Sequence, residues 1–189
     1  MLGTLHSQRL ALRDVSVDDA ASFLDLDRDP EVMRFLGGVR PDATLADTRA
    51  LLADRIATYR GRPGLGLGAC FLHQSGEFIG WFMLRPRSYR PYDATGALLE
   101  PVEDAELGYR LARRFWGCGY ATEMSTALVR HGFDQLGLRH IVAFVDAEHH
   151  ASVRVLEKAG LSHVGRARYD ADDHELYRIS SPTQHTLQR

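Results

Sequence analysis

The chain has 189 residues, of which 44% are hydrophobic and 25% charged, a composition typical of a soluble globular protein and not of a disordered one. Its 23 Lys and Arg residues nearly balance its 25 Asp and Glu residues, so no general basic field is available to attract nucleic acid or an anionic membrane. Two cysteines without metal-type spacing, and no leader-like or membrane-spanning apolar run, predict a cytoplasmic protein without a metal site.

The N-terminal part is predicted to form one strand followed by helices. Polar and apolar residues alternate over residues 9–13, as they do in a half-buried strand, and residues 14–19 supply loop and helix-start signals. A helix then continues from about residue 20 to the Asp29-Pro30 pair, where proline interrupts the pattern. Two more helices are predicted over residues 31–36 and 45–59, the first ended by a pair of glycines.

The middle of the chain is rich in glycine and proline. Residues 61–68 carry four glycines and a proline, and we predict a turn there, because strand-like runs over 69–73 and 78–84 follow, whereas a phosphate-binding loop needs a helix. Residues 86–104, with three prolines, are predicted to form a long irregular connection, and loops of that length are usually functional or mobile.

The second half predicts a mixed sheet. Residues 106–111 and 141–145 are strand-like, and the second run is uninterrupted and apolar, as in a buried strand. An amphipathic helix over about 119–136 joins the two strands, which therefore have to be parallel and linked by a right-handed crossover. The remaining elements are a short helix over 150–159 and strands over 163–168 and 175–180.

The turn that opens the helix at 119 has the features of an anion site. Gly117 and Gly119 lack the Cβ atoms that would keep a phosphate from the backbone, and glycine tolerates a positive φ. The first N–H groups of a helix have no intrahelical partner and lie at the positive end of the dipole, so a diphosphate fits there. The pattern is not the dinucleotide fingerprint, because Ala121 and Thr122 follow. An ordinary strand-to-helix turn is the alternative interpretation.

Several segments, in this order and spacing, resemble the GNAT acyltransferase superfamily, and in particular its branch of ribosomal-protein alanine and serine N-terminal acetyltransferases. They are RLALR at 9–13, DPEVMRFL at 29–36, ELGYRL at 106–111, WGCGYATE at 116–123 and ASVRVLEKAGL at 151–161. The resemblance implies a single α/β (α+β, mixed-sheet) acyl-CoA N-acyltransferase domain over residues 1–189. Its expected fold has about seven mostly antiparallel strands, a parallel central pair splayed around the coenzyme, and about four flanking helices.

The resemblance also implies acetyl-CoA as cosubstrate, no metal, and a set of coenzyme-binding residues. Strand residues 108–111 would pair with the pantetheine arm like an added strand, and the loop would hold the diphosphate. The implied set is Gly108, Tyr109, Arg110, Leu111, Arg114, Gly117, Cys118, Gly119, Tyr120, Ala121, Thr122, His149 and Ser152. Three positions depart from the family pattern: His149 replaces an asparagine, Cys118 a basic residue, and Leu156 a tyrosine that acts as general acid in many members.

Acetyl transfer to an amine needs a base, a stabilised oxyanion and a proton for the leaving thiolate. Glu106 is the candidate base, as in members that the chain resembles, and strand alternation places it on one face with Gly108 and Arg110. A structural ion pair is the alternative. Ser152 is the candidate proton donor, with a helix cap as the alternative. Two tyrosines, Tyr109 and Tyr120, are further candidate donors.

The acceptor is expected to be an amine. Glu100, Glu103 and Asp104 precede Glu106 and would attract a cationic amine to the start of the strand, although a solvated acidic loop is the alternative. A protein or peptide N-terminal α-amino group is the first candidate, and a small amine such as an antibiotic, a polyamine or an amino-acid derivative is the second. A non-catalytic acyl-CoA-binding module is a third reading. Neither nucleic acid nor a membrane is an expected partner, and a homodimer is one open alternative.

Overall fold

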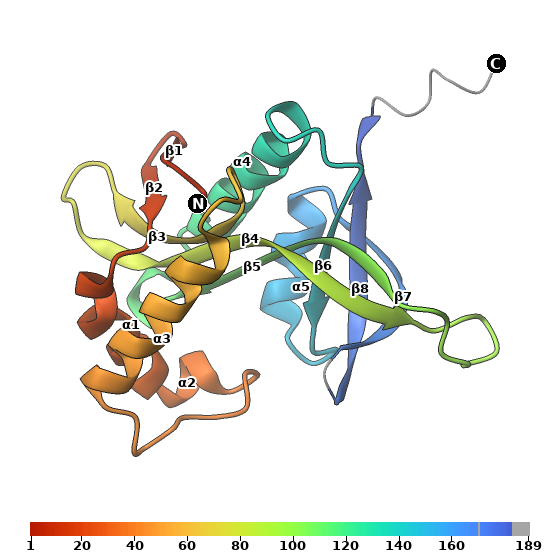
Figure 1. Cartoon of the computed structure of the whole chain (residues 1–189), viewed down its shortest axis with the longest axis horizontal. Helices are drawn as coiled ribbons and strands as arrows, with labels where there is room; N and C mark the ends of the chain where they lie inside the picture. Colours follow the sequence, from red (N-terminus) through yellow and green to blue (C-terminus); the bar gives the residue numbers. More distant parts are fainter. Residues whose placement is uncertain (170, 183–189) are drawn as a thin grey trace.

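One mixed sheet organises the protein (Figure 1), whose computed structural model describes residues 1–169 and 171–182. The strands in this part of the chain lie in the order β1-β2-β3-β4-β5-β6-β8-β7, and every pair is antiparallel except β5–β6. Their bounds are β1 Leu5–His6, β2 Leu10–Asp14, β3 Gly66–Leu72, β4 Phe78–Pro91, β5 Val102–Leu111, β6 His140–Val145, β7 Ser162–Tyr169 and β8 Asp172–Ser180. The expected α/β fold with a parallel central pair is confirmed.

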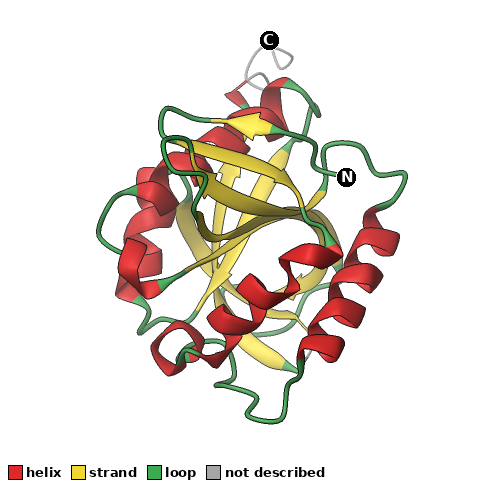
Figure 2. Cartoon of the chain, turned by 90° about the vertical axis from the view of Figure 1, so that its left-hand side faces the viewer, coloured by secondary structure: helices red, strands yellow, loops and turns green. Residues whose placement is uncertain are grey.

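Helices cover both faces of this sheet (Figure 2). The helices α1 and α3 pack on each other, α1 against β4 and α3 against β3, whereas α4 and α5 pack together, with α4 against β5 and α5 against β6. Their bounds are η1 Val17–Asp19, α1 Ala20–Arg28, α2 Pro30–Met33, α3 Leu45–Tyr59, η2 Arg113–Phe115, α4 Tyr120–Asp134 and α5 His150–Lys158. The helix predicted over 45–59 has the same bounds as α3, because a capping box between Thr44 and Asp47 fixes its start.

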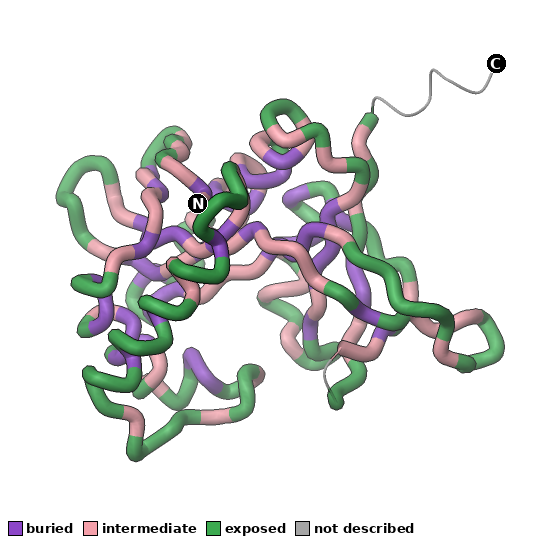
Figure 3. The backbone as a smooth tube through the Cα atoms, in the orientation of Figure 1, coloured by how far each residue is buried: buried purple, intermediate pink, exposed green. Residues whose placement is uncertain are grey.

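Buried residues concentrate along the strands and the inner faces of the helices (Figure 3). The largest core cluster joins β2, β4 and β5 to α4, and includes the fully buried Leu12, Phe82, Met124 and Leu128. A smaller cluster lies between α1, α3 and β3. Burial of these side chains, each contributing about 1.5–3 kcal/mol, holds both helical layers against the sheet.

The sheet opens at its centre. β5 and β6 pair in parallel at Ala105↔Ile141 and Glu106↔Val142, and the two strands diverge beyond these positions. The far end of β4 pairs with β7 at Arg90↔Arg168, so the second half of the sheet curves back on the first. The divergence leaves one backbone edge of β5 facing a gap, while β4 pairs with the other edge over the whole strand.

The prediction of an irregular connection over residues 86–104 is wrong. β4 continues to Pro91 and β5 begins at Val102, so the connection is confined to residues 92–101. Pro86 is tolerated inside β4 because β3 ends its pairing at Leu84, which leaves that edge of the strand without a ladder. The predicted turn over 61–68 is likewise shorter, since β3 begins at Gly66.

Candidate active site

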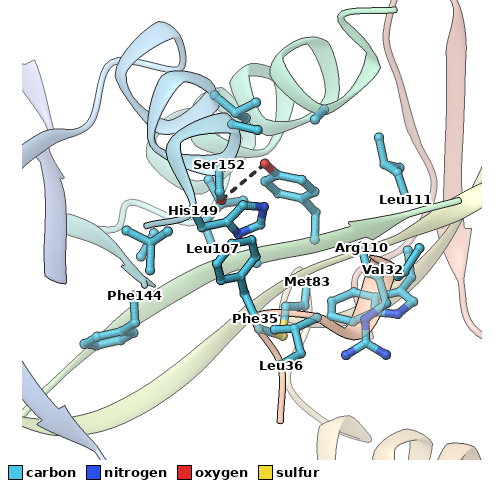
Figure 4. Close-up of a pocket in the computed structure, with 18 of the residues that line it drawn as sticks. Val32, Phe35, Leu36, Met83, Leu107, Arg110, Leu111, Phe144, His149 and Ser152 are labelled. Atoms are coloured by element: carbon cyan, nitrogen blue, oxygen red, sulfur yellow. Dashed lines mark hydrogen bonds between the residues drawn. The ribbon is translucent and has the colours of Figure 1, made fainter. Parts of the chain in front are cut away.

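A cavity of about 1200 Å³ lies where β5 and β6 diverge (Figure 4). Residues of α4, α5 and β6 line one half, and residues of α1–α3, β4 and the opposite face of β5 line the other. Alternation along β5 explains the division: Leu107, Tyr109 and Leu111 pack with the α4 core, whereas Glu106 and Arg110 face the α1–α3 side. We name these the α4 half and the α3 half.

The α4 half contains the predicted anion loop. Gly117 and Gly119 have φ values of 75° and 81°, and Gly119 is the left-handed N-cap of α4, with no side chain capping the helix. The first N–H groups of α4 are therefore free to bind an anion, and the loop and the first turn both line the cavity. A Cβ at Gly117 would meet no atom within 4 Å, so the space next to this backbone is open.

Most of the predicted coenzyme-binding residues line the cavity, but Arg114 and Cys118 do not. The Arg114 guanidinium bonds to the Glu77 carboxylate at 3.0 Å, and Cys118 is exposed on the outside of the loop. A residue that the sequence did not indicate supports the loop instead. Arg9 donates to the Cys118 carbonyl at 3.1 Å and stacks over the Tyr120 ring at 4.5 Å. No sequence signal links Arg9 to a loop so far along the chain.

Two basic residues of α5, Arg154 and Lys158, also line the cavity and were missed. Their spacing of one helical turn places them on one side of α5, which is the only sequence signal that could have indicated them. Both are exposed. They can supply the positive charge for phosphate groups that Arg114 does not.

His149 lies across the cavity from the α3 half. Its ring stacks on Phe35 with a centroid distance of 4.4 Å and an interplanar angle of 15° (Figure 4). Burial lowers the pKa of His149, and Asp146 offsets this only in part, so the ring is neutral near pH 7. The stack joins the segment after α2 to the start of α5, and the two rings together form part of the cavity wall.

Glu106 occupies the point where the two central strands part. Its carboxylate is buried, and its Oε2 accepts from Arg85 Nε at 2.8 Å and from Arg87 Nε at 2.9 Å. Among the described residues, none donates a hydrogen bond to Oε1. The two guanidinium groups thus fix the carboxylate through one oxygen, and the other oxygen is available to a group in the cavity.

Ser152 and Tyr109 form a hydroxyl pair. Tyr109 Oη donates to Ser152 Oγ at 3.3 Å (Figure 4), and burial raises the pKa of the Tyr109 phenol. Ser152 does not cap α5, whose N-cap is His149 without a side-chain cap bond, so the capping alternative is wrong. Leu156 is buried in the core, one turn along the helix. The Ser152 hydroxyl is thus the polar group of α5 that lies beside Tyr109.

The acidic residues before Glu106 do not form the mouth of the cavity. Glu100 and Glu103 are exposed and lie outside the lining formed by the described residues, and Asp104 accepts a hydrogen bond from Tyr89 at 2.8 Å. The predicted acidic entrance is therefore wrong. The described residues also hold no group of three or more His, Cys, Asp or Glu that could bind a metal. None of their helices combines the length and apolarity needed to cross a membrane.

Comparison with known proteins identifies the family and structures with the same fold. The family model of the acetyltransferase (GNAT) domain matches residues 9–162. A relative named FsC-acetyl coenzyme A-N(2)-transacetylase, from Aspergillus fumigatus, is 28% identical over 203 residues, which cover 95% of this chain and 80% of that protein. The crystal structure of an acetyltransferase from Agrobacterium tumefaciens superposes with a TM-score of 0.73, 26% identity and 96% coverage of both chains. Mycobacterium smegmatis RimJ in complex with CoA-disulfide shares the fold, with a TM-score of 0.72, 20% identity, and coverage of 97% of this chain and 90% of that one.

Proposed function

Since the chain belongs to the GNAT acetyltransferase family and is an N-acetyltransferase, we propose that it moves the acetyl group of acetyl-CoA to a primary amine held beside Glu106. The first acceptor class that we propose is the α-amino group of a peptide or protein N-terminus. The observation that carries this proposal is the position of Glu106, which is the last residue of β5 paired to β6 and lines the α3 half of the cavity. We also propose a cytoplasmic location, with a homodimer as one alternative for its assembly.

The α4 half fits the coenzyme. Residues 117–122 would hold the diphosphate through backbone N–H groups, with Arg154 and Lys158 supplying charge, and the free edge of β5 would pair with the amides of the pantetheine arm. When bound, acetyl-CoA supplies the thioester that the amine attacks. A backbone N–H of residues 108–111 is the proposed donor to the negative charge that develops on the thioester carbonyl.

Glu106 is the proposed general base. An amine has to lose a proton before or during attack, and Glu106 Oε1 can accept that proton directly or through a water. The bonds from Arg85 and Arg87 to Oε2 fix the direction of the carboxylate, so that Oε1 stays in place while the amine binds. Glu106 thus forms the ion pair that was the alternative interpretation of this residue, and its second carboxylate oxygen is still available to accept a proton.

Ser152 is the proposed donor to the leaving sulfur. Its hydroxyl lines the α4 half, and Tyr109 can return a proton to it through their shared hydrogen bond. The raised pKa keeps the Tyr109 phenol protonated at neutral pH, so its proton can replace the one that Ser152 gives to the sulfur, and solvent then returns a proton to Tyr109. This pair would replace the tyrosine that many family members have where Leu156 stands.

A small amine is the second candidate acceptor, because the relative from Aspergillus fumigatus is named for acetyl transfer to N(2) of FsC. Mass-spectrometric detection of acetylated products from N-terminal peptides, polyamines and aminoglycoside-like amines tests both classes in one assay. The matched control is the Glu106→Gln variant. If neither a product nor faster CoA release than in the protein-free control appears with any amine, the proposed function is refuted.

A further inference from the structure

The α3 half of the cavity carries more positive than negative charge. Its described lining from α1 to the end of β5 includes five arginines, Arg34, Arg40, Arg55, Arg85 and Arg110, but three carboxylates, Asp27, Glu31 and Glu106. A pocket that received only an ammonium group would be expected to have the opposite balance, because like charges repel most strongly where water is scarce. The acceptor therefore needs a feature that compensates this charge.

Two of the three carboxylates are already paired with particular arginines. Glu106 pairs with Arg85, and Asp27 pairs with Arg110, which also stacks over the Trp81 ring at 5.1 Å. The Nε of Arg110 is buried and has no hydrogen-bond partner among the described residues. These ion pairs involve Arg85 and Arg110. The excess positive charge therefore lies on the other three arginines, Arg34, Arg40 and Arg55.

Arg55 is the clearest unpaired cation. It is half-buried in α3 and lines the cavity, but it forms no ion pair or hydrogen bond with any described residue. Arg40, which follows α2 in the chain, lines the same half and lies close enough to Arg110 to lower the pKa of that guanidinium, after burial, which is the larger cause. Neither arginine forms an ion pair with a described carboxylate, although the charge of Arg40 reaches Asp47 and contributes to its lowered pKa. Two such guanidinium groups lining one cavity are suited to binding a carboxylate, since five donors in a planar fork match two oxygens.

The arrangement also connects this charge to Glu106. Arg55 and Tyr59 are one turn apart on α3, about 6 Å along the helix axis. The Tyr59 side chain lies near enough to Arg85 to contribute to the raised pKa of that guanidinium, which in turn holds Glu106. A continuous wall thus leads from Arg55 to Glu106, and an acceptor that spans it has its amine at one end and an anion at the other.

We propose that the acceptor carries a carboxylate, which Arg55 and Arg40 bind while its amino group lies at Glu106. This inference rests on the proposed function and names the substrate class of the same site. In a peptide acceptor the carboxylate is an acidic side chain close to the N-terminus, and in a small acceptor it is the acid group of an amino acid derivative. The chemistry recognised is the same in both.

Paired acceptors that differ in one charge test the proposal. The first pair is a peptide with glutamate at its second position and the same peptide with glutamine; the second is a small ω-amino acid and its amide. We expect kcat/KM to be at least about tenfold higher for the acid of one pair, with most of the difference in KM, because a charged hydrogen-bond partner is being removed. Which pair responds distinguishes the peptide source of the carboxylate from the small-molecule source.

Variants of α3 provide the matched comparison. Arg55→Gln should reduce kcat/KM for the preferred acid about tenfold or more and leave the value for its amide unchanged. Arg49→Gln removes an exposed arginine of the same helix that lies outside the described cavity lining, and it should behave like the wild type with every acceptor. Equal kcat/KM for acid and amide in both pairs, with acetyl transfer observed, would overturn the carboxylate proposal and leave the proposed function intact.

A binding measurement decides the proposal even without turnover. The N-acetylated products of both pairs are titrated into the protein by calorimetry in the presence of CoA. Tighter binding of the acid than of the amide in one pair, lost in Arg55→Gln and kept in Arg49→Gln, supports the carboxylate site. Equal affinities in both pairs refute it. Absence of acetyl transfer to every acceptor would refute the proposed function separately.

Discussion

Replacing Glu106 with glutamine separates its chemical role from its structural one. The glutamine amide oxygen can take the place of Oε2 and accept the bonds that Arg85 and Arg87 now donate at 2.8 and 2.9 Å. The amide nitrogen then takes the place of Oε1, which no described residue contacts by a hydrogen bond, and it cannot accept a proton. We therefore expect Glu106→Gln to keep the fold and to lose general-base catalysis. The expected loss in kcat is about 10²–10⁴-fold, or about 3–5 kcal/mol in the barrier.

Release of the CoA thiol, followed from pH 6 to pH 9, measures this loss. Calorimetric affinity for acetyl-CoA should stay unchanged, because the proposed coenzyme site is the α4 half of the cavity. Glu103→Gln is the matched control, since Glu103 is an exposed carboxylate of the same strand outside the described lining. A rate within about twofold of the wild type at every pH would refute the base assignment. A fall in thermal stability and coenzyme affinity, in proportion to the fall in rate, would assign Glu106 a structural role instead.

Three further predictions concern the loop, the hydroxyl pair and a distant contact. Gly119→Arg should fill the anion site and weaken acetyl-CoA binding by about tenfold or more, as measured by calorimetry. The control is Gly137→Arg, which is also at a positive φ but in open surroundings and should leave the affinity unchanged. Equal affinities of the two variants for acetyl-CoA would exclude the assigned loop. Ser152→Ala should lower kcat about 10²-fold. Adding Tyr109→Phe to this variant should lower kcat little further, because the two hydroxyls act as a unit. Additive losses in single-turnover rates would show that the two hydroxyls have independent roles. Glu123→Gln should cost about 1–2 kcal/mol of unfolding free energy at pH 7, because Glu123 accepts bonds from Ser7 and Arg9. Burial alone would raise the pKa of Glu123, but these bonds lower it below the value in the unfolded chain. The stabilisation is therefore present at pH values above the ordinary glutamate pKa, and it is lost as the pH falls through the pKa of the folded protein. Thermal unfolding of both proteins should thus converge in acid, and a constant difference down to about pH 3 would contradict this account.

The sequence predicted correctly those elements whose ends are fixed by contacts between neighbouring residues. The helix over 45–59 is an example, because Thr44 and Asp47 bond to each other's backbone and need no distant partner. The glycine turn before α4 is another, because two glycines at positive φ and a helix start are properties of adjacent residues. The face assignment of Glu106 followed from the two-residue period of a strand, and the structure agrees with it.

Features set by tertiary pairing could not be predicted in this way. The sequence around Pro86 is typical of a strand end, but the strand continues because β5 pairs with β4 on one edge, while no described strand pairs with the other edge at that point. The contact of Arg9 with the Cys118 carbonyl depends on where β2 lies relative to α4. The surplus of arginines could not be predicted either, because Arg40 and Arg55 line one cavity only in the folded protein, where α3 packs against α1.

The pairing of β5 explains why the two substrates can be recognised independently. Its β4 edge is paired from Val102 to Leu111, so the strand is held in place, and its alternating side chains place Tyr109 in the proposed coenzyme half and Glu106 on the other face. At Gly108, between Glu106 and Arg110, a Cβ would lie 2.3 Å from Met83 Cε, so a larger residue would displace the end of a side chain of the α3 half. The proposed acceptor contacts then come from the segment from α1 to α3, which makes none of the proposed coenzyme contacts. Exchanges in α3 should therefore alter acceptor choice while leaving the affinity for acetyl-CoA unchanged, and Arg55 is the residue at which this separation is most directly measured.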